Sequence, residues 1–329
     1  MDTVKLARYR ICKIWRQCPR SVYRMFPSDD TSGAPRAGED DIGHPRDIAR
    51  PLVFMHIPKC AGTAIDKCLR DGAPSDRQFN LLGPTLYGDF DDYDSFGPEV
   101  RGWIHEAGND CPQDIDYVAG HAGARWFDRA YPNGQKITFL REPKMRILSH
   151  WLYWRTFSEA ERSYWGTYSP RLDLAMSDLE TFIGAPQLAS QVDNVFVRML
   201  LYPHPLVPGG DFISPEHDAT LAAEAIAAID RFGFVGLVED RDLIPKLQAW
   251  LGRPLTLTAE NVARPMPEAL RHPLRDALTR RAWSRLESGS RLDQVIWDHV
   301  AKKGAKADPR AMQTAAIAYS VARFADIMR

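Results

Sequence analysis

Two short stretches of the sequence combine residue types that bind anions. The first, residues 56–65, reads HIPKCAGTAI, with Lys59 and Thr63 on either side of a small-residue loop. The apolar run 51–57 is typical of a buried parallel strand, and 63–71 is typical of a helix. A strand, a tight loop and a helix N-terminus direct backbone N–H groups toward one point. The sequence therefore predicts a cradle for a phosphate-like anion at the carboxyl edge of an open α/β sheet.

The second stretch, residues 136–155, reads KITFLREPKMRILSHWLYWR. Its segment 137–140 predicts another buried strand, with Arg141 at the strand end. Pro143 suits the first turn of the next helix, and Ser149 follows about two turns later. A guanidinium at a strand end and a hydroxyl on the next helix can converge on a second phosphate. The alternative is that Arg141 is a surface or salt-bridged arginine.

A candidate general base follows a third apolar run, residues 117–121, which read YVAGH. This run predicts a short strand ending at Gly120 and His121, so that the imidazole lies at the same edge of the sheet. A pKa near neutrality suits a histidine to general-base work. The alternative is a structural histidine. Weaker candidates for the base are His56, which we expect to be buried, and His105, Glu106, Asp116 and Asp128.

These stretches resemble a known family. HIPKCAGT resembles the 5′-phosphosulfate-binding loop of the membrane-type carbohydrate sulfotransferases (sulfotransferase family 2), and LREPKMRILSHW resembles their 3′-phosphate element. FGFVGLVEDRDLIPKLQAWLG and SRLDQVIWDHV resemble a later strand, helix and C-terminal helix of that family, so the likeness covers residues 51–303. Two positions depart from the pattern: Cys60 replaces a threonine, with loss of one hydroxyl, and Ala61 replaces a glycine.

The resemblance implies a P-loop-like parallel sheet flanked by helices and the donor 3′-phosphoadenosine 5′-phosphosulfate, with no metal. It implies that Lys59 stabilises the leaving group, and the Gly-His pair is similar to that of the uronyl 2-O-sulfotransferases, whose histidine is the proposed base. The implied donor-binding residues are Pro58, Lys59, Cys60, Ala61, Gly62, Thr63, Ala64, Arg141 and Ser149. The implied acceptor is a hydroxyl of a carbohydrate, a glycolipid or a small hydroxylated compound.

Two other classes of function stay open at this point. A P-loop-type nucleotide kinase would use the same anion cradle, but the pattern G-x-x-x-x-G-K-[ST] is missing. A non-catalytic, membrane-associated nucleotide-binding protein would not need Lys59, Thr63, His121, Arg141 and Ser149 together.

Composition limits the partners and the cellular compartment that we expect for the protein. The formal net charge of −1 gives no general attraction to nucleic acid. The five cysteines form no C-x-x-C pair and no metal-ligand spacing, and their odd number favours a reducing compartment. No apolar run approaches the roughly 20 residues that span a bilayer, and the N-terminus lacks the apolar block of a signal peptide. Eukaryotic members of the resembling family are typically anchored by one membrane helix, and its absence leads us to expect a cytoplasmic, bacterial protein.

The chain divides into four segments: residues 1–27 are basic, 28–50 are a linker, 51–303 are the sulfotransferase-like domain, and 304–329 are a C-terminal helical extension. Residues 1–18 have apolar side chains at helical spacing, and 1–27 hold seven Lys or Arg against one acid. Such a helix can lie on the anionic inner membrane surface or pack on the domain. We expect further helices at 190–201, 215–229 and 243–251, a strand at 232–237, and loops across 71–112.

Overall fold

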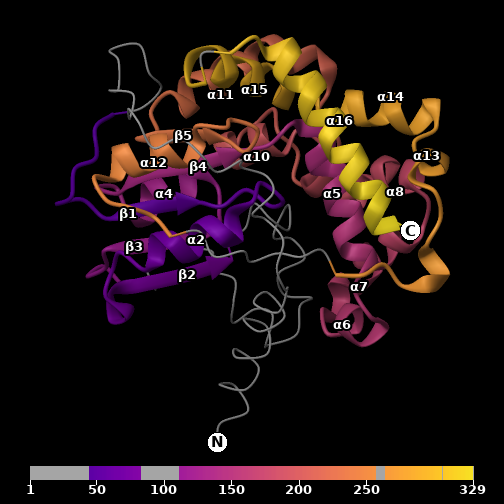
Figure 1. Ribbon diagram of the computed structural model, residues 1–329, viewed down its shortest axis with the longest axis horizontal. Helices are drawn as coiled ribbons and strands as arrows, with labels where there is room; N and C mark the ends of the chain where they lie inside the picture. Colours follow the sequence, from indigo (N-terminus) through magenta and orange to yellow (C-terminus); the bar gives the residue numbers. More distant parts are fainter. Residues whose placement is uncertain (1–43, 83–110, 257–263, 306, 329) are drawn as a thin grey trace, which may run out of the picture.

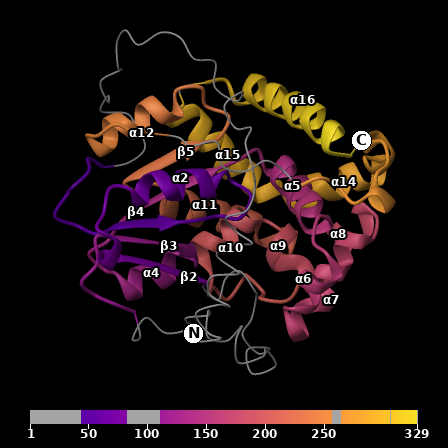
Figure 2. The same ribbon diagram turned by 60° about the horizontal axis from the view of Figure 1, so that its bottom comes forward.

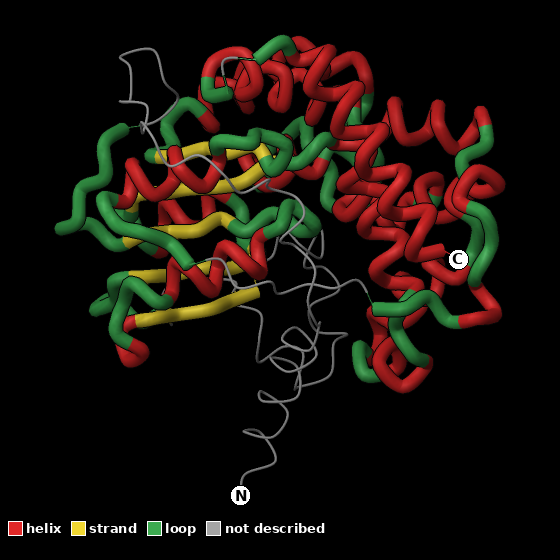
Figure 3. Tube along the Cα trace, in the orientation of Figure 1, coloured by secondary structure: helices red, strands yellow, loops and turns green. Residues whose placement is uncertain are grey.

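The computed structural model describes residues 44–82, 111–256, 264–305 and 307–328, so the basic segment 1–27 lies outside the described residues. Five strands form one parallel sheet with the order β2-β3-β1-β4-β5. They are β1 (Leu52–Met55), β2 (Gln78–Leu82), β3 (Tyr117–His121), β4 (Gln135–Leu140) and β5 (Phe234–Leu237). Figure 3 shows them in yellow as one stack. The predicted α/β class with a parallel sheet flanked by helices is confirmed.

The strands are apolar runs because helices cover both faces of the sheet. In β1, Leu52 and Phe54 belong to one buried layer, while Val53 and Met55 belong to the other. The first layer is closed by α2 (Gly62–Arg70) and α12 (Leu243–Leu251). The second is closed by α4 (Ala124–Ala130), α10 (Val195–Leu201), α11 (Asp218–Ile229) and α15 (Arg291–Lys303). The sheet lies between these two sets of helices (Figures 1 and 2).

The strand order places a switch point at the centre of the sheet. The connection after β1 runs to β2, beyond β3, whereas the connections after β3 and β4 run toward the opposite edge at β5. The carboxyl ends of β1 and its neighbour β4 therefore flank the crevice in which open α/β sheets bind ligands. The predicted anion-binding stretches directly follow these two strands.

A second, helical region packs beside the sheet and is entered by α5 (Pro143–Arg155), which leaves the carboxyl end of β4 (Figure 1). Its core contains the fully buried rings of Trp151 and Phe182 together with Phe324 near the end of the chain. The other helices of this region are α6 (Glu159–Ser163), α7 (Ser169–Asp173), α8 (Leu179–Gly184), α9 (Ala189–Val192), α13 (Leu274–Ala277), α14 (Arg280–Gly289) and α16 (Pro309–Met328).

Two sequence expectations about elements are wrong. The helix expected at 190–201 is broken into α9 and α10 by Asn194, which has a left-handed φ of 46°. The Asn194 side chain accepts a hydrogen bond from the Leu292 N–H at 2.8 Å, and this tertiary contact outweighs the helical pattern. The stretch 71–112, expected to be rich in loops, contains an unpredicted edge strand, β2, that pairs with β3, and its residues 83–110 lie outside the described residues. Within the described ranges, no helix is long and apolar enough to cross a membrane.

Candidate active site

The loop between β1 and α2 has a strained backbone. Lys59 and Ala61 have φ values of 69° and 59°, in the left-handed region that residues other than glycine rarely adopt. Left-handed residues in a tight loop turn successive N–H groups into one concavity, which binds anions. Such strain is typical of functional sites, where the surrounding structure maintains it. The loop thus has a backbone shape that suits an anion, and the binding of one stays a prediction.

The N-terminus of α2 carries no competing acceptor. Its N-cap residue Ala61 makes no side-chain cap, and its first turn holds no acidic residue. By contrast, α5 is capped by Glu142, whose carboxylate accepts from the Met145 N–H at 2.8 Å. Because the first N–H groups of a helix have no acceptor within the helix, the positive end of α2 suits an anion.

Gly62 is required at the start of α2 because a histidine ring lies against it. A Cβ built on Gly62 would lie 1.9 Å from Nε2 of His56. The ring of His56 stacks on Phe54, with 5.1 Å between the ring centroids, so it cannot easily move away. His56 is half-buried beside the loop and packs against both the sheet and α2.

Lys59 reaches from the loop to the helical region. Its Nζ lies 3.7 Å from the centroid of the Tyr153 ring on α5, a cation–π distance. Ser149 is half-buried one helical turn before Tyr153, on the same face of α5, and makes no hydrogen bond with a described residue. The structure thus brings Lys59 and the Ser149 face of α5 toward each other.

Arg141 is buried at the end of β4 and turns toward α16. Its Nη2 donates to Oγ of Ser320 at 3.3 Å, and its Cζ lies 5.3 Å from the centroid of the Phe324 ring. Burial lowers the pKa of Arg141, and the carboxylate of Glu239 opposes this. The expectation of an arginine at this strand end is met, whereas the alternative of a surface arginine is excluded by an exposed fraction of 9%.

Cys60 joins the two predicted anion-binding stretches. Its thiol is buried and lies within electrostatic reach of Arg146 and Arg141. Burial raises the pKa of the thiol to about 12, so that it is protonated and not a nucleophile at neutral pH. The sulfur therefore packs the loop against β4 in the place where the resembling family has a threonine.

His121 ends β3 and is held in one tautomer. Its Nδ1 lies 2.6 Å from the carbonyl oxygen of His56. A carbonyl can only accept, so Nδ1 carries the hydrogen and Nε2 keeps a lone pair. Gly120 precedes it because a Cβ there would lie 2.3 Å from the backbone oxygen of Leu81 on β2. The structure thus presents an imidazole with a basic Nε2 at the carboxyl edge.

The near-neutral pKa expected for His121 is wrong. Burial lowers the pKa to about 4, since the ring is 4% exposed and the charge of Lys59 also disfavours its protonation. The hydrogen bond to His56 opposes this shift without cancelling it. The imidazole is therefore neutral at pH 7, with its hydrogen on Nδ1.

Two residues of α5 that sequence reasoning did not assign to the site lie in it. His150 is buried, and Nδ1 of its ring has no hydrogen-bond partner among the described residues. Burial lowers its pKa well below the usual value, and the nearby charges of Arg146, Lys59 and His121 act in the same direction. Arg146, also buried, donates to the Gln191 carbonyl at 2.7 Å, whereas its Nε and Nη1 have no partner. Both residues fall in the stretch KMRILSHW, but no spacing rule singled them out.

Glu239 follows β5 and lies at the carboxyl edge of the sheet. Its carboxylate accepts from the backbone N–H of Glu142 at 2.8 Å. Burial raises its pKa to about 7, while the charge of Arg141 lowers it. Glu239 thus lies within electrostatic reach of Arg141 at this edge.

Of the weaker candidates for the base, His56 lies at this edge, with its ring centroid 4.3 Å from that of His121, and burial lowers its pKa well below the usual value. The others do not lie at this edge or are not described. Asp116 immediately precedes β3, at the amino end of the sheet, and forms an ion pair with Arg77 at 2.8 Å. Asp128 forms an ion pair with Lys136. His105 and Glu106 lie outside the described residues. Of the candidates that the structure describes, His121 is the one with a fixed tautomer at the carboxyl edge.

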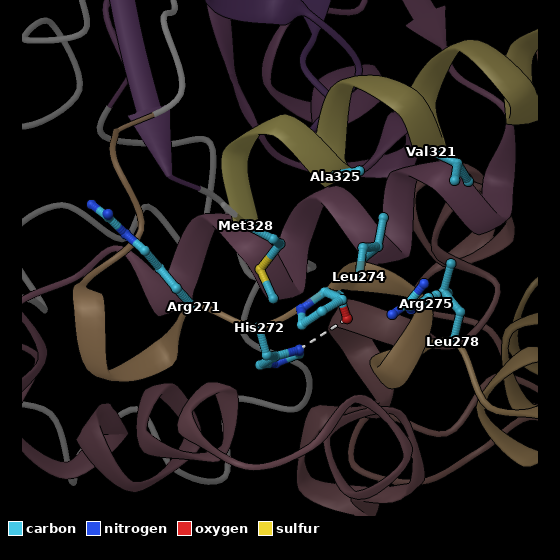
Figure 4. A pocket seen from close by; sticks show the side chains of 9 residues that line it. Arg271, His272, Leu274, Arg275, Leu278, Val321, Ala325 and Met328 are labelled. Atoms are coloured by element: carbon cyan, nitrogen blue, oxygen red, sulfur yellow. Dashed lines mark hydrogen bonds between the residues drawn. The ribbon is translucent and has the colours of Figure 1, made fainter.

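A separate cavity of about 610 Å³ lies between α13 and the end of α16 (Figure 4). Its lining consists of Arg271, His272, Pro273, Leu274, Arg275, Leu278, Val321, Ala325 and Met328. All of these residues belong to the helical region and none to the carboxyl edge of the sheet. The cavity is therefore distinct from the site built by Lys59, His121 and Arg141.

No protein-family model matches the sequence, and a comparison with curated proteins finds no similar sequence.

Proposed function

We propose that this protein is a sulfotransferase that moves a sulfuryl group from 3′-phosphoadenosine 5′-phosphosulfate to a hydroxyl of a carbohydrate, glycolipid or small hydroxylated acceptor. One observation carries the proposal. The strained loop after β1 and the buried Arg141 after β4 adjoin at a switch point, because β1 and β4 are neighbouring parallel strands. Two adjacent anion sites suit a donor with phosphates at both its 5′ and 3′ positions.

In this proposal the loop and the uncapped end of α2 hold the 5′-phosphosulfate. The backbone N–H groups of residues 58–64 and the Thr63 hydroxyl donate to it, at the positive end of the helix. Arg141 and Ser149 bind the 3′-phosphate, since a charge-assisted guanidinium–phosphate contact is the strongest that this edge offers. The same 3′-phosphate would distinguish the donor from ATP.

The transfer step needs one cation and one base. The S–O bond to the donor phosphate breaks as the S–O bond to the acceptor oxygen forms, and negative charge develops on the bridging oxygen. Lys59, which is held near α5 by Tyr153, stabilises that charge. Nε2 of His121 accepts the acceptor's hydroxyl proton, since its Nδ1 donates to His56. The products are the sulfate ester and 3′-phosphoadenosine 5′-phosphate.

The two alternative functions have weaker support. A kinase loop would carry a G-K-[ST] ending, whereas this loop carries Lys59 before Cys60 and Ala61, at a left-handed position. A non-catalytic binding protein would need neither the fixed tautomer of His121 nor a lysine in a strained loop. The sulfuryl-transfer proposal uses all of these features.

The test is transfer from a sulfur-labelled donor, screened over extracted glycans, glycolipids and small metabolites, with product masses read for one added sulfate. We expect labelled product with the full chain, about a hundredfold to a thousandfold slower transfer with Lys59→Ala, and the same rate after treatment with EDTA. Magnesium-dependent turnover of ATP, with no transfer of label, would instead support the kinase alternative. Absence of both activities, with intact nucleotide binding, would support the binding-protein alternative.

A further inference from the structure

The C-terminal helix α16 lies beyond the part of the chain that resembles the sulfotransferase family, yet it reaches the predicted 3′-phosphate site. It packs on α5 and α15, and its Gln313 donates to Glu142, the N-cap of α5, at 3.0 Å (Figure 1). Two turns farther along, Ser320 accepts from Arg141, and Phe324 lies under the same guanidinium. This helix therefore forms one wall around Arg141.

A second arginine is on this wall. Arg323 is one helical turn from Ser320 and directly precedes Phe324, so that the contacts of those two residues bring it to Arg141. Its side chain is half-buried and forms neither a hydrogen bond nor an ion pair with a described residue. The charge of Arg323 also lowers the pKa of Arg141, as expected of two guanidinium groups within electrostatic reach.

The nearby acids do not occupy this pair of arginines. Glu239 and Glu142 lie within electrostatic reach of Arg141, but neither forms an ion pair with it among the described residues, and Glu142 pairs with Lys144 at 2.8 Å. The structure shows no ion pair between either carboxylate and Arg323 within the described ranges. Two arginines placed together without a shared carboxylate are suited to a divalent anion, which can accept from both.

We propose that α16 contributes Arg323 and Ser320 to the 3′-phosphate site, so that donor binding fastens the C-terminal helix to α5. This inference rests on the proposed function, because the anion is the 3′-phosphate of the donor. It assigns a nucleotide-binding role to a segment that the family resemblance leaves outside the domain. Arg141 would approach the phosphate from the end of β4, Ser149 from α5, and Arg323 from α16.

The test compares 3′-phosphoadenosine 5′-phosphate with AMP, which lacks the 3′-phosphate, by calorimetry on the full chain. Arg323→Ala should weaken binding of the bisphosphate by about tenfold or more and leave the affinity for AMP unchanged. Arg310→Ala is the matched control, because Arg310 is an exposed arginine in the first turn of the same helix and its loss changes the net charge equally. That variant should bind both nucleotides as the wild type does.

Hydrogen exchange gives a second reading. The bisphosphate should slow exchange of the backbone amides in α16 of the wild type, and AMP should not. If Arg141→Ala abolishes the preference for the bisphosphate while Arg323→Ala retains it, the role of α16 is contradicted and the proposed function stands. If the wild type itself binds the two nucleotides equally, the proposed function fails together with this inference.

Discussion

Polar groups at the amino and carboxyl ends of the parallel sheet differ in how fully they are paired by hydrogen bonds. At the amino end, the buried side chain of Gln135 donates to the Pro45 carbonyl at 2.7 Å and accepts from the Asp47 N–H at 2.9 Å. There too, Arg77 donates to both carboxylate oxygens of Asp116 at 2.9 and 2.8 Å. These two sets of polar groups are paired within the protein, and they tie loops and strands together, although the buried hydroxyl of Tyr131 at the same end has no partner among the described residues.

At the carboxyl end, by contrast, the structure places a strained loop and buried polar groups without hydrogen-bond partners among the described residues. Two residues of the loop after β1 are left-handed, and α2 starts without a side-chain cap. Nδ1 of His150 and two nitrogens of Arg146 are buried without partners among the described residues. Backbone strain and unpaired polar groups are typical of sites that bind a ligand or carry out a reaction. The contrast therefore favours a functional site at the carboxyl end of the sheet. Substitutions at the two ends should consequently differ in kind.

The largest expected effect is that of His121. Replacement by Gln keeps a hydrogen bond to the His56 carbonyl but removes the basic nitrogen, so turnover should fall by roughly a hundredfold to ten-thousandfold. Binding of the donor nucleotide should change little. Because burial lowers the pKa of His121 to about 4, the rise of kcat/KM with pH should lie well below the usual histidine range. A pH–rate profile checks this, and a folded variant with normal turnover and the same profile would remove His121 from the mechanism.

Lys59→Ala should cost slightly less, about a hundredfold to a thousandfold in kcat, as does the loss of a comparable donor to a developing oxyanion. Binding of the product nucleotide should weaken far less, because Lys59 acts most strongly in the transition state. Steady-state kinetics and calorimetry on the same preparation separate the two effects. If kcat fell less than tenfold in a well-folded variant, Lys59 would not be the group that stabilises the leaving oxygen.

The buried histidines predict sensitivity to acid. A histidine whose folded pKa lies below its unfolded value contributes stability that is present above pH 6.5 and is lost as the pH falls toward the folded pKa. For His121 the loss by pH 4 approaches about 3 kcal/mol, from a shift of the pKa from 6.5 to about 4. Urea unfolding of wild type and His121→Gln at pH 7 and pH 4 measures it, since the difference between the proteins cancels other groups. Equal losses in both would show that the pKa of His121 is not lowered in the folded protein.

The smallest effect on activity should come from the amino end. Gln135→Ala leaves the Pro45 carbonyl and the Asp47 N–H without their partner, at a cost of about 1–3 kcal/mol in the free energy of unfolding. Turnover at saturating donor should stay within twofold of the wild type, as the ligand crevice lies at the other end. A large drop in kcat, measured under conditions where the variant is folded, would break the contrast between the two ends.

The elements around the site could be predicted from the sequence because apolar runs and turn residues define them locally. The strand 117–121 was predicted with its observed bounds, and α2 begins one residue before the predicted start. The positions of Lys59, His121 and Arg141 at one edge follow from parallel topology, in which the carboxyl ends of strands meet. What could not be predicted depends on tertiary contacts.

Three findings show that dependence. The pKa of His121 follows from burial, and the partnerless nitrogens of Arg146 follow from packing around α5; the stretch itself indicates neither. The contact between Arg141 and Ser320 joins residues 179 positions apart. No local sequence pattern indicates such a contact, so the proposed role of α16 could be inferred only from the structure.

The most direct test of the central claim is the affinity of the wild-type chain for 3′-phosphoadenosine 5′-phosphate and for ADP, measured by calorimetry alongside Arg141→Ala. Two adjacent anion sites predict that the wild type binds the 3′-phosphorylated nucleotide more tightly than ADP, and that Arg141→Ala loses tenfold or more of that affinity. Equal affinity of the wild type for the two nucleotides would contradict the account.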